Sequence, residues 1–158
     1  MVLNSASAVL LSQIPAGNLI VIRIPAGPLL GMRVTAPDGT NAVVLFEADK
    51  TPTFLPLQAD PLCVDLGVHA ALRVTDLPGA FSRLDTAHAV GNLAIEGKSV
   101  CIIAVVPAGP NSFGGEVLVD VATGKVIVSG GAERWYVKKW QFGHLDAGGE
   151  FVNLWTKG

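Results

Sequence analysis

Apolar and polar residues alternate along most of the chain, with the period of two that sends successive side chains to opposite faces of a β-strand. In the clearest case, residues 62–69, one face is predicted to hold Leu62, Val64, Leu66 and Val68, and the other Cys63, Asp65, Gly67 and His69. This segment is therefore predicted to be a half-buried strand. The same pattern predicts further strands at 19–24, 30–35, 41–47, 72–75, 99–106, 116–121, 125–129, 134–142 and 150–155.

Turn residues separate these segments. The sequence Pro-Asp-Gly-Thr at 37–40 predicts a turn, and Ala-Thr-Gly-Lys at 122–125 predicts a tight hairpin between two valine-rich strands. At most one short helix is predicted, near 79–89, and the prolines at 52, 56 and 61 predict an irregular crossover. Strands without alternating helices predict an all-β fold, a single antiparallel β-sandwich, jelly-roll or barrel domain over residues 1–158.

A short tetrapeptide recurs along the chain. Ile-Pro-Ala-Gly occurs at 14–17 and 24–27, and Val-Pro-Ala-Gly follows at 106–109. We interpret these segments as punctuation at strand ends, because proline cannot donate to a β-ladder and glycine allows the chain to turn.

Residues 1–22 carry no charge, but polar residues and Pro15 interrupt them, so no signal peptide or membrane anchor is expected. Residues 1–13 are expected to form an N-terminal arm.

Composition narrows the classes of function. The 158 residues include 11 Lys and Arg against 13 Asp and Glu, giving a net charge of -2, and 50% of them are hydrophobic. Nucleic-acid or anionic-membrane binding is not expected, since both need a strongly basic surface. Cys63 and Cys101 are predicted to be buried free thiols, with a disulfide left as the alternative. A small domain has a large surface for its volume, and few charged residues are present to cover it. The composition therefore favours apolar contacts with other subunits.

Motifs for catalysis or cofactors are missing from the sequence. There is no phosphate-binding glycine loop, no nucleophile elbow and no metal-ligand spacing among His69, His88 and His144. The sequence therefore predicts a protein that is not an enzyme and that holds neither a cofactor nor a metal.

The C-terminal third holds most of the aromatic residues, interleaved with basic ones. Six residues of this region are the candidate interface or ligand platform, namely Trp135, Tyr136, Lys138, Trp140, Phe142 and Trp155. Such residues stack on sugars or bases, or form the buried centre of a protein interface. A third interpretation is that the aromatic rings fill the core while the lysines protect a strand edge.

An all-β chain with little charge and no catalytic set is similar in general character to the small β-sandwich and jelly-roll subunits of phage particles, such as capsid cement proteins and tail components. This likeness implies a virion subunit that forms a homo-oligomer, for instance a trimer, and binds another structural protein. If the protein is not from a phage, a cytoplasmic location is expected. The alternative hypothesis is a cupin-like or lectin-like barrel that binds a small molecule or carbohydrate, with or without enzymatic activity, through Trp135, Trp140 and Trp155.

Overall fold

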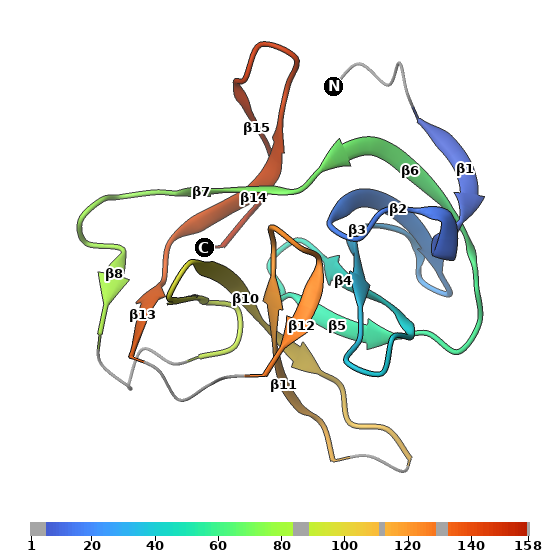
Figure 1. Cartoon of the computed structure of the whole chain (residues 1–158), viewed down its shortest axis with the longest axis horizontal. Helices are drawn as coiled ribbons and strands as arrows, with labels where there is room; N and C mark the ends of the chain where they lie inside the picture. Colours follow the sequence, from blue (N-terminus) through green and yellow to red (C-terminus); the bar gives the residue numbers. More distant parts are fainter. Residues whose placement is uncertain (1–5, 84–88, 111–112, 129–132, 158) are drawn as a thin grey trace.

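The computed structural model describes residues 6–83, 89–110, 113–128 and 133–157, and almost all of its regular structure is β-strand (Figure 1). The helical element among these residues is one 3-10 turn, η1, at Leu11–Gln13. The strands are β1 (Ser7–Leu10), β2 (Asn18–Ile24), β3 (Gly27–Thr35), β4 (Asn41–Phe46), β5 (Thr53–Pro56), β6 (Leu62–His69), β7 (Ala71–Val74), β8 (Phe81–Ser82), β9 (Leu93–Glu96), β10 (Ser99–Val106), β11 (Gly115–Asp120), β12 (Lys125–Ile127), β13 (Arg134–Val137), β14 (Trp140–Leu145) and β15 (Phe151–Thr156). The predicted all-β class is confirmed.

Six of these strands close into a barrel. Each strand of the circuit pairs with the next: β3 with β4, β4 with β5, β5 with β10, β10 with β11, β11 with β12, and β12 again with β3. The β5–β10 and β12–β3 pairings are parallel, and the other four are antiparallel. Strands β2, β6 and β1 extend the sheet from β3, while β9, β13 and β8 extend it from β10. The prediction left a sandwich, a jelly roll and a barrel open. The closed circuit of pairings defines a barrel, since only a barrel joins its first strand to its last.

The six barrel strands belong to two four-stranded meanders of the same topology, β2–β5 and β9–β12, whose first strands, β2 and β9, lie outside the closed circuit. Within each meander every strand pairs antiparallel with the next one along the chain. The last strand of each meander then pairs in parallel with the second strand of the other. Equivalent backbone hydrogen bonds close the two seams: the Thr35 N–H donates to Gly124 O (2.8 Å), and the Val105 N–H donates to Pro52 O (2.9 Å). The two meanders are therefore interlocked.

A short sequence repeat opens both meanders. Gly-Asn-Leu occurs at 17–19 and again at 91–93, and the two glycines have φ of +89° and +87°. In each copy the asparagine N–H donates to the carbonyl three residues earlier, and the leucine is fully buried. The Ile-Pro-Ala-Gly segments lie at strand ends as predicted, but they do not mark this repeat.

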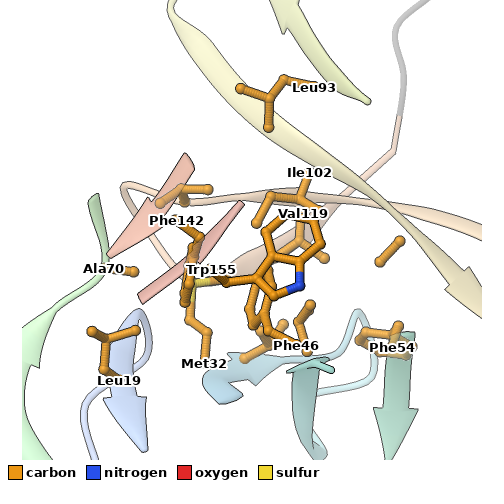
Figure 2. Packing of buried hydrophobic residues seen from close by; sticks show 14 of the residues in the cluster. Leu19, Met32, Phe46, Phe54, Ala70, Leu93, Ile102, Val119, Phe142 and Trp155 are labelled. Atoms are coloured by element: carbon orange, nitrogen blue, oxygen red, sulfur yellow. The ribbon is translucent and has the colours of Figure 1, made fainter. Parts of the chain in front are cut away.

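Alternate side chains of both meanders fill the barrel. The interior residues include Leu19, Met32, Val34, Val44, Ile102, Ala104 and Val119, each 0% exposed, and Figure 2 shows several of them. Neighbouring positions on the same strands, such as Val43 and Ile103, belong to separate clusters outside the barrel. Burial of one large aliphatic side chain stabilises the folded state by about 1.5–3 kcal/mol, so the interior is the main source of stability.

A second sheet, in the order β15–β14–β7, covers the barrel where β4 and β11 end (Figure 1). Its Trp140, Phe142 and Trp155 belong to the same cluster as the barrel interior. Phe142 stacks on Phe46, the last residue of β4, with ring centroids 3.8 Å apart, and Trp155 lies 5.1 Å from Trp140. The aromatic residues of the C-terminal third thus join this sheet to the barrel.

The N-terminal segment packs on the outside of the first meander. Strand β1 pairs with β6, the Leu11 N–H donates to Pro61 O, and the Ser12 hydroxyl donates to Asp60. Leu11 is fully buried, together with residues of β2 and β4. Within the expected N-terminal arm, Ser7–Gln13 therefore folds against its own chain, while residues 1–5 lie outside the described part.

Two predictions about individual elements are wrong. The strand predicted at 134–142 is two strands, because the chain breaks at Lys138 and Lys139 and passes from β13 in the large sheet to β14 in the small one. In the helix predicted at 79–89, Phe81–Ser82 instead forms strand β8, paired with β13, and residues 84–88 lie outside the described part.

The predicted facing of β6 holds only in part. Val64, Leu66 and Val68 pack toward the barrel interior as expected, whereas Leu62 is 64% exposed and Cys63 is buried in the outer cluster. The β2–β6 register shifts in the half of β6 that contains Gly67, whose φ is +67°. Strand β6 is consequently covered on both faces over part of its length.

Gly124 offers a test of the interlocked meanders. A Cβ atom there would lie 2.2 Å from the backbone nitrogen of Gly17, whereas Gly97, with almost the same φ (+61° against +62°), has open space around it. We expect Gly97→Ala to lower the free energy of unfolding by about 1–2 kcal/mol, the cost of the left-handed conformation alone. Gly124→Ala should lower it by roughly 3–5 kcal/mol, because backbone from the other meander must move. Urea unfolding of both variants measures the difference, and equal losses would contradict the close seam.

Candidate functional site

The six residues of the predicted interface or ligand platform do not share one surface. Tyr136, Trp140, Phe142 and Trp155 are buried, with Trp140 and Phe142 at 0% exposure. Trp135 is 44% exposed on β13, and Lys138 is exposed in the connection to β14. Most of the aromatic surface in this region is therefore used inside the protein.

The two buried tryptophans anchor the small sheet to the barrel. The Trp140 indole N–H donates to Gly91 O over 2.9 Å, and the Trp155 indole N–H donates to Glu47 O over 2.8 Å. A buried indole that finds an acceptor for its N–H avoids the cost of an unsatisfied donor. These bonds connect β14 to the start of the second meander and β15 to the β4–β5 turn of the first.

Trp135 lies at one side of an open apolar hollow that we call the Trp135 patch. Its other members are Pro78, Phe81 and Ile95, and the hollow has a volume of about 470 Å³. The Arg83 guanidinium lies over the Trp135 ring, 5.3 Å from its centroid, and also forms an ion pair with Glu133. The patch is thus an apolar surface with an aromatic ring and a cation at its rim.

A second hollow, which we call the Trp155 cleft, runs along both sides of the end of β15. Its two parts, of about 380 and 430 Å³, share Asp49, Trp155 and Thr156. Asn153 lies in the first part, and Lys50, Thr51 and Lys157 lie in the second. Polar side chains and the edge of a buried aromatic residue line this cleft together.

The cysteines are free and buried, as predicted. Burial, together with the nearby carboxylates of Asp120 and Glu96, raises the pKa of the Cys101 thiol to about 12. Burial also raises the pKa of the Cys63 thiol, with a smaller contribution from Asp60. Since the thiolate is the nucleophilic form, both groups are poorly suited to covalent chemistry.

The histidines that the structure describes bond to backbone carbonyls, His69 Nε2 to Val121 O (3.1 Å) and His144 Nδ1 to Leu145 O (3.0 Å). His88 lies outside the described part. Among the described residues, no group of three or more His, Cys, Asp and Glu side chains is placed to hold a metal ion.

Arg33 is a buried charged residue that the sequence pattern does not indicate. Arg33 on β3 is buried, and its guanidinium donates to Thr35 on the same strand and to Asn41 on β4 (2.6 Å). Burial lowers the pKa of Arg33, and the Asp60 carboxylate partly opposes this effect. An alternating strand gives no signal that its polar face will be covered, so Arg33 reads as a surface residue in the sequence.

The members of both hollows other than the tryptophans were likewise not candidates from the sequence. The Trp135 patch joins side chains from β8, β9 and β13, and the Trp155 cleft joins the β4–β5 turn to β15. Pairing between strands far apart in the chain joins β8, β9 and β13, and the Trp155 indole bond to Glu47 O holds β15 against the β4–β5 turn. The chain carries no local motif for either contact.

Comparisons with known proteins add no functional information. No protein-family model matches the chain, and neither the curated proteins nor the solved structures include a match. Within the described ranges, no helix has the length and apolar character needed to cross a bilayer.

Substitution of Trp140 tests whether its side chain is part of the core or part of a ligand-binding surface. Because this side chain is fully buried against the barrel and its N–H is bonded, Trp140→Ala should lower the free energy of unfolding by about 3–5 kcal/mol. Trp135→Ala, at a half-exposed position on the same region of chain, should cost about 1 kcal/mol or less. Chemical denaturation followed by circular dichroism gives both values. Similar small losses in the two variants would show that Trp140 is not part of the core.

Proposed function

We propose that this protein is a structural subunit that assembles with further copies of itself and with another structural protein, as the cement and tail proteins of phage particles do. The Trp135 patch carries the proposal. Contiguous apolar surface with a polar rim is characteristic of protein contacts. Tryptophan and arginine, which meet at this patch, are also the residue types that contribute most to binding energy at the centres of interfaces.

Other exposed apolar side chains support the same proposal. Leu10 on β1 and Leu62 on β6 lie opposite each other in register and are 41% and 64% exposed. Strand β1 is the last strand at its end of the large sheet and has no charged residue. Uncharged outer strands favour pairing with another chain, because charged or proline residues are the usual protection against it.

The proposed partners follow from the chemistry of these surfaces. Apolar side chains and open sheet ends suit other proteins, whereas a net charge of -2 gives no general attraction for nucleic acid or anionic lipid. Under this proposal the protein acts in a particle, with no catalytic step, and its homo-oligomer is held by contacts that salt does not weaken.

Light scattering of the purified protein, at several concentrations and at low and high salt, tests the proposal. We expect an oligomer whose mass does not fall at high salt. Trp135→Ser should weaken the association by about thirtyfold or more, since removal of an interface hot spot costs about 2 kcal/mol or more. Circular dichroism should show that the variant remains folded, because Trp135 is outside the core cluster.

Phe113→Ser is the matched control. Phe113 is 99% exposed in the β10–β11 connection, so its loss removes exposed aromatic surface at another place without affecting the core. The control should keep the mass of the unaltered protein. A monomer under all conditions would contradict self-association, and dissociation by Phe113→Ser alone would place the contact away from the Trp135 patch.

A further inference from the structure

We propose that the Trp155 cleft is a binding site for a neutral saccharide, independent of the assembly surface. The filled interior of the barrel leaves the outside of the protein as the place for a ligand. Each part of the cleft falls within the range of roughly 300–1,000 Å³ that is usual for small-molecule sites. Among the three tryptophans that the sequence suggests as a pocket lining, Trp155 is the one that borders this cleft.

The cleft exists because the two meanders differ at equivalent turns. In the second meander, residues 121–124 join β11 to β12 in a tight turn, and Gly124 fits closely against Gly17. The equivalent β4–β5 turn is two residues longer, 47–52, and includes Asp49 with φ of +58°. The first turns of the two meanders, 25–26 and 97–98, have the same length, whereas the β10–β11 connection, 107–114, is three residues longer than the β3–β4 connection, 36–40. The β4–β5 turn is thus one of two places where the connections of the meanders differ in length.

Backbone contacts hold the walls of the cleft in place. The Trp155 indole is tied to Glu47 O at 2.8 Å, and the Lys50 N–H donates to the same carbonyl at 3.3 Å. On the other side, the Lys157 N–H donates to Trp140 O at 3.0 Å. The turn and the end of β15 are therefore fixed relative to each other, and a ligand would meet side chains that are already positioned.

The charges around the cleft balance one another. The lining holds Asp49 and Lys157, which carry opposite charges, and Lys50, which forms an ion pair with Glu47. Such a balance gives no net attraction for an anion or a cation. The lining therefore favours a ligand without charge.

The remaining lining provides both kinds of contact that a sugar ring needs. Lysine, threonine and asparagine side chains supply donors, while Asp49 supplies acceptor oxygens. Next to them lie the half-buried side chain of Leu30 and the narrow exposed edges of Phe46 and Trp155, which are 4% and 7% exposed. A pyranose has hydroxyls that donate and accept hydrogen bonds, and C–H faces that pack on aromatic and aliphatic groups. These features match the lining better than a purely apolar or a charged ligand would.

Titration of the ¹⁵N-labelled full-length protein with D-glucose, D-galactose and N-acetyl-D-glucosamine, each to about 50 mM because single-sugar sites bind with millimolar Kd, tests the proposal. At least one sugar should give saturable chemical-shift changes in the backbone amides of Asp49, Asn153 and Thr156. Asp49→Gly removes the carboxylate while allowing the positive φ, and should weaken binding by about tenfold. Asp38→Gly, at an exposed turn elsewhere, is the matched control and should bind as the unaltered protein does.

Three results would overturn the proposal. They are the absence of saturable changes with all three sugars, equal affinity in the Asp49→Gly variant, and saturable changes at these amides with sodium phosphate or acetate in place of the sugars. The first two would exclude the site and the third would exclude the ligand class. None of them depends on whether the Trp135 patch forms an interface.

Discussion

The structure depends on the two parallel seams that close the barrel. β3 and β10 each carry two neighbours along a single edge: β3 pairs first with β2 and then, at Thr35, with β12, while β10 pairs first with β9 and then, at Val105, with β5. Each of these two strands therefore extends past the first strand of its own meander and pairs, near its end, with the last strand of the other meander. Once both seams form, the inward side chains are enclosed, and the small sheet with its aromatic residues covers one opening. The closeness of Gly124 to Gly17 shows how little space the seam leaves for any other residue.

Local pattern was sufficient to predict the longest strands of the barrel. β3, β4, β10 and β11 are apolar-rich segments of at least six residues between clear turns, and their predicted positions agree with the structure to within a few residues. By contrast, β5 and β9 have four residues each, and Pro52 and Pro56 flank or end β5, so neither has a periodic signal. The Gly-Asn-Leu repeat is similarly too short to stand out, although it marks the start of both meanders.

The aromatic cluster shows why the candidate site was harder to predict than the fold. Trp140 lies between Lys139 and Gln141, and Trp155 is followed by Thr156, so the local sequence suits an exposed platform as well as the inner face of a sheet. The difference is made by partners far away in the chain, because Trp140 lies opposite Val74 of β7, and Trp155 packs against Phe46 of β4. Of the three tryptophans, Trp135, paired with Ile95 of β9, is the one that stays exposed, at 44%. Both proposed surfaces then lie where the barrel motif is extended or varied: the patch on strands added beyond β10, and the cleft at a lengthened turn.

Hydrogen exchange of the Thr35 and Val105 amides tests the interlocked barrel most directly, because each of these N–H groups donates its hydrogen bond across a seam. The account predicts that both exchange only through global unfolding, with an opening free energy equal to that of Ile103, whose N–H is bonded to Asn92 O within the second meander. Exchange of Thr35 and Val105 at a distinctly lower free energy, while Ile103 stays protected, would mean that the seams open on their own. That result would contradict a barrel whose two halves hold each other closed.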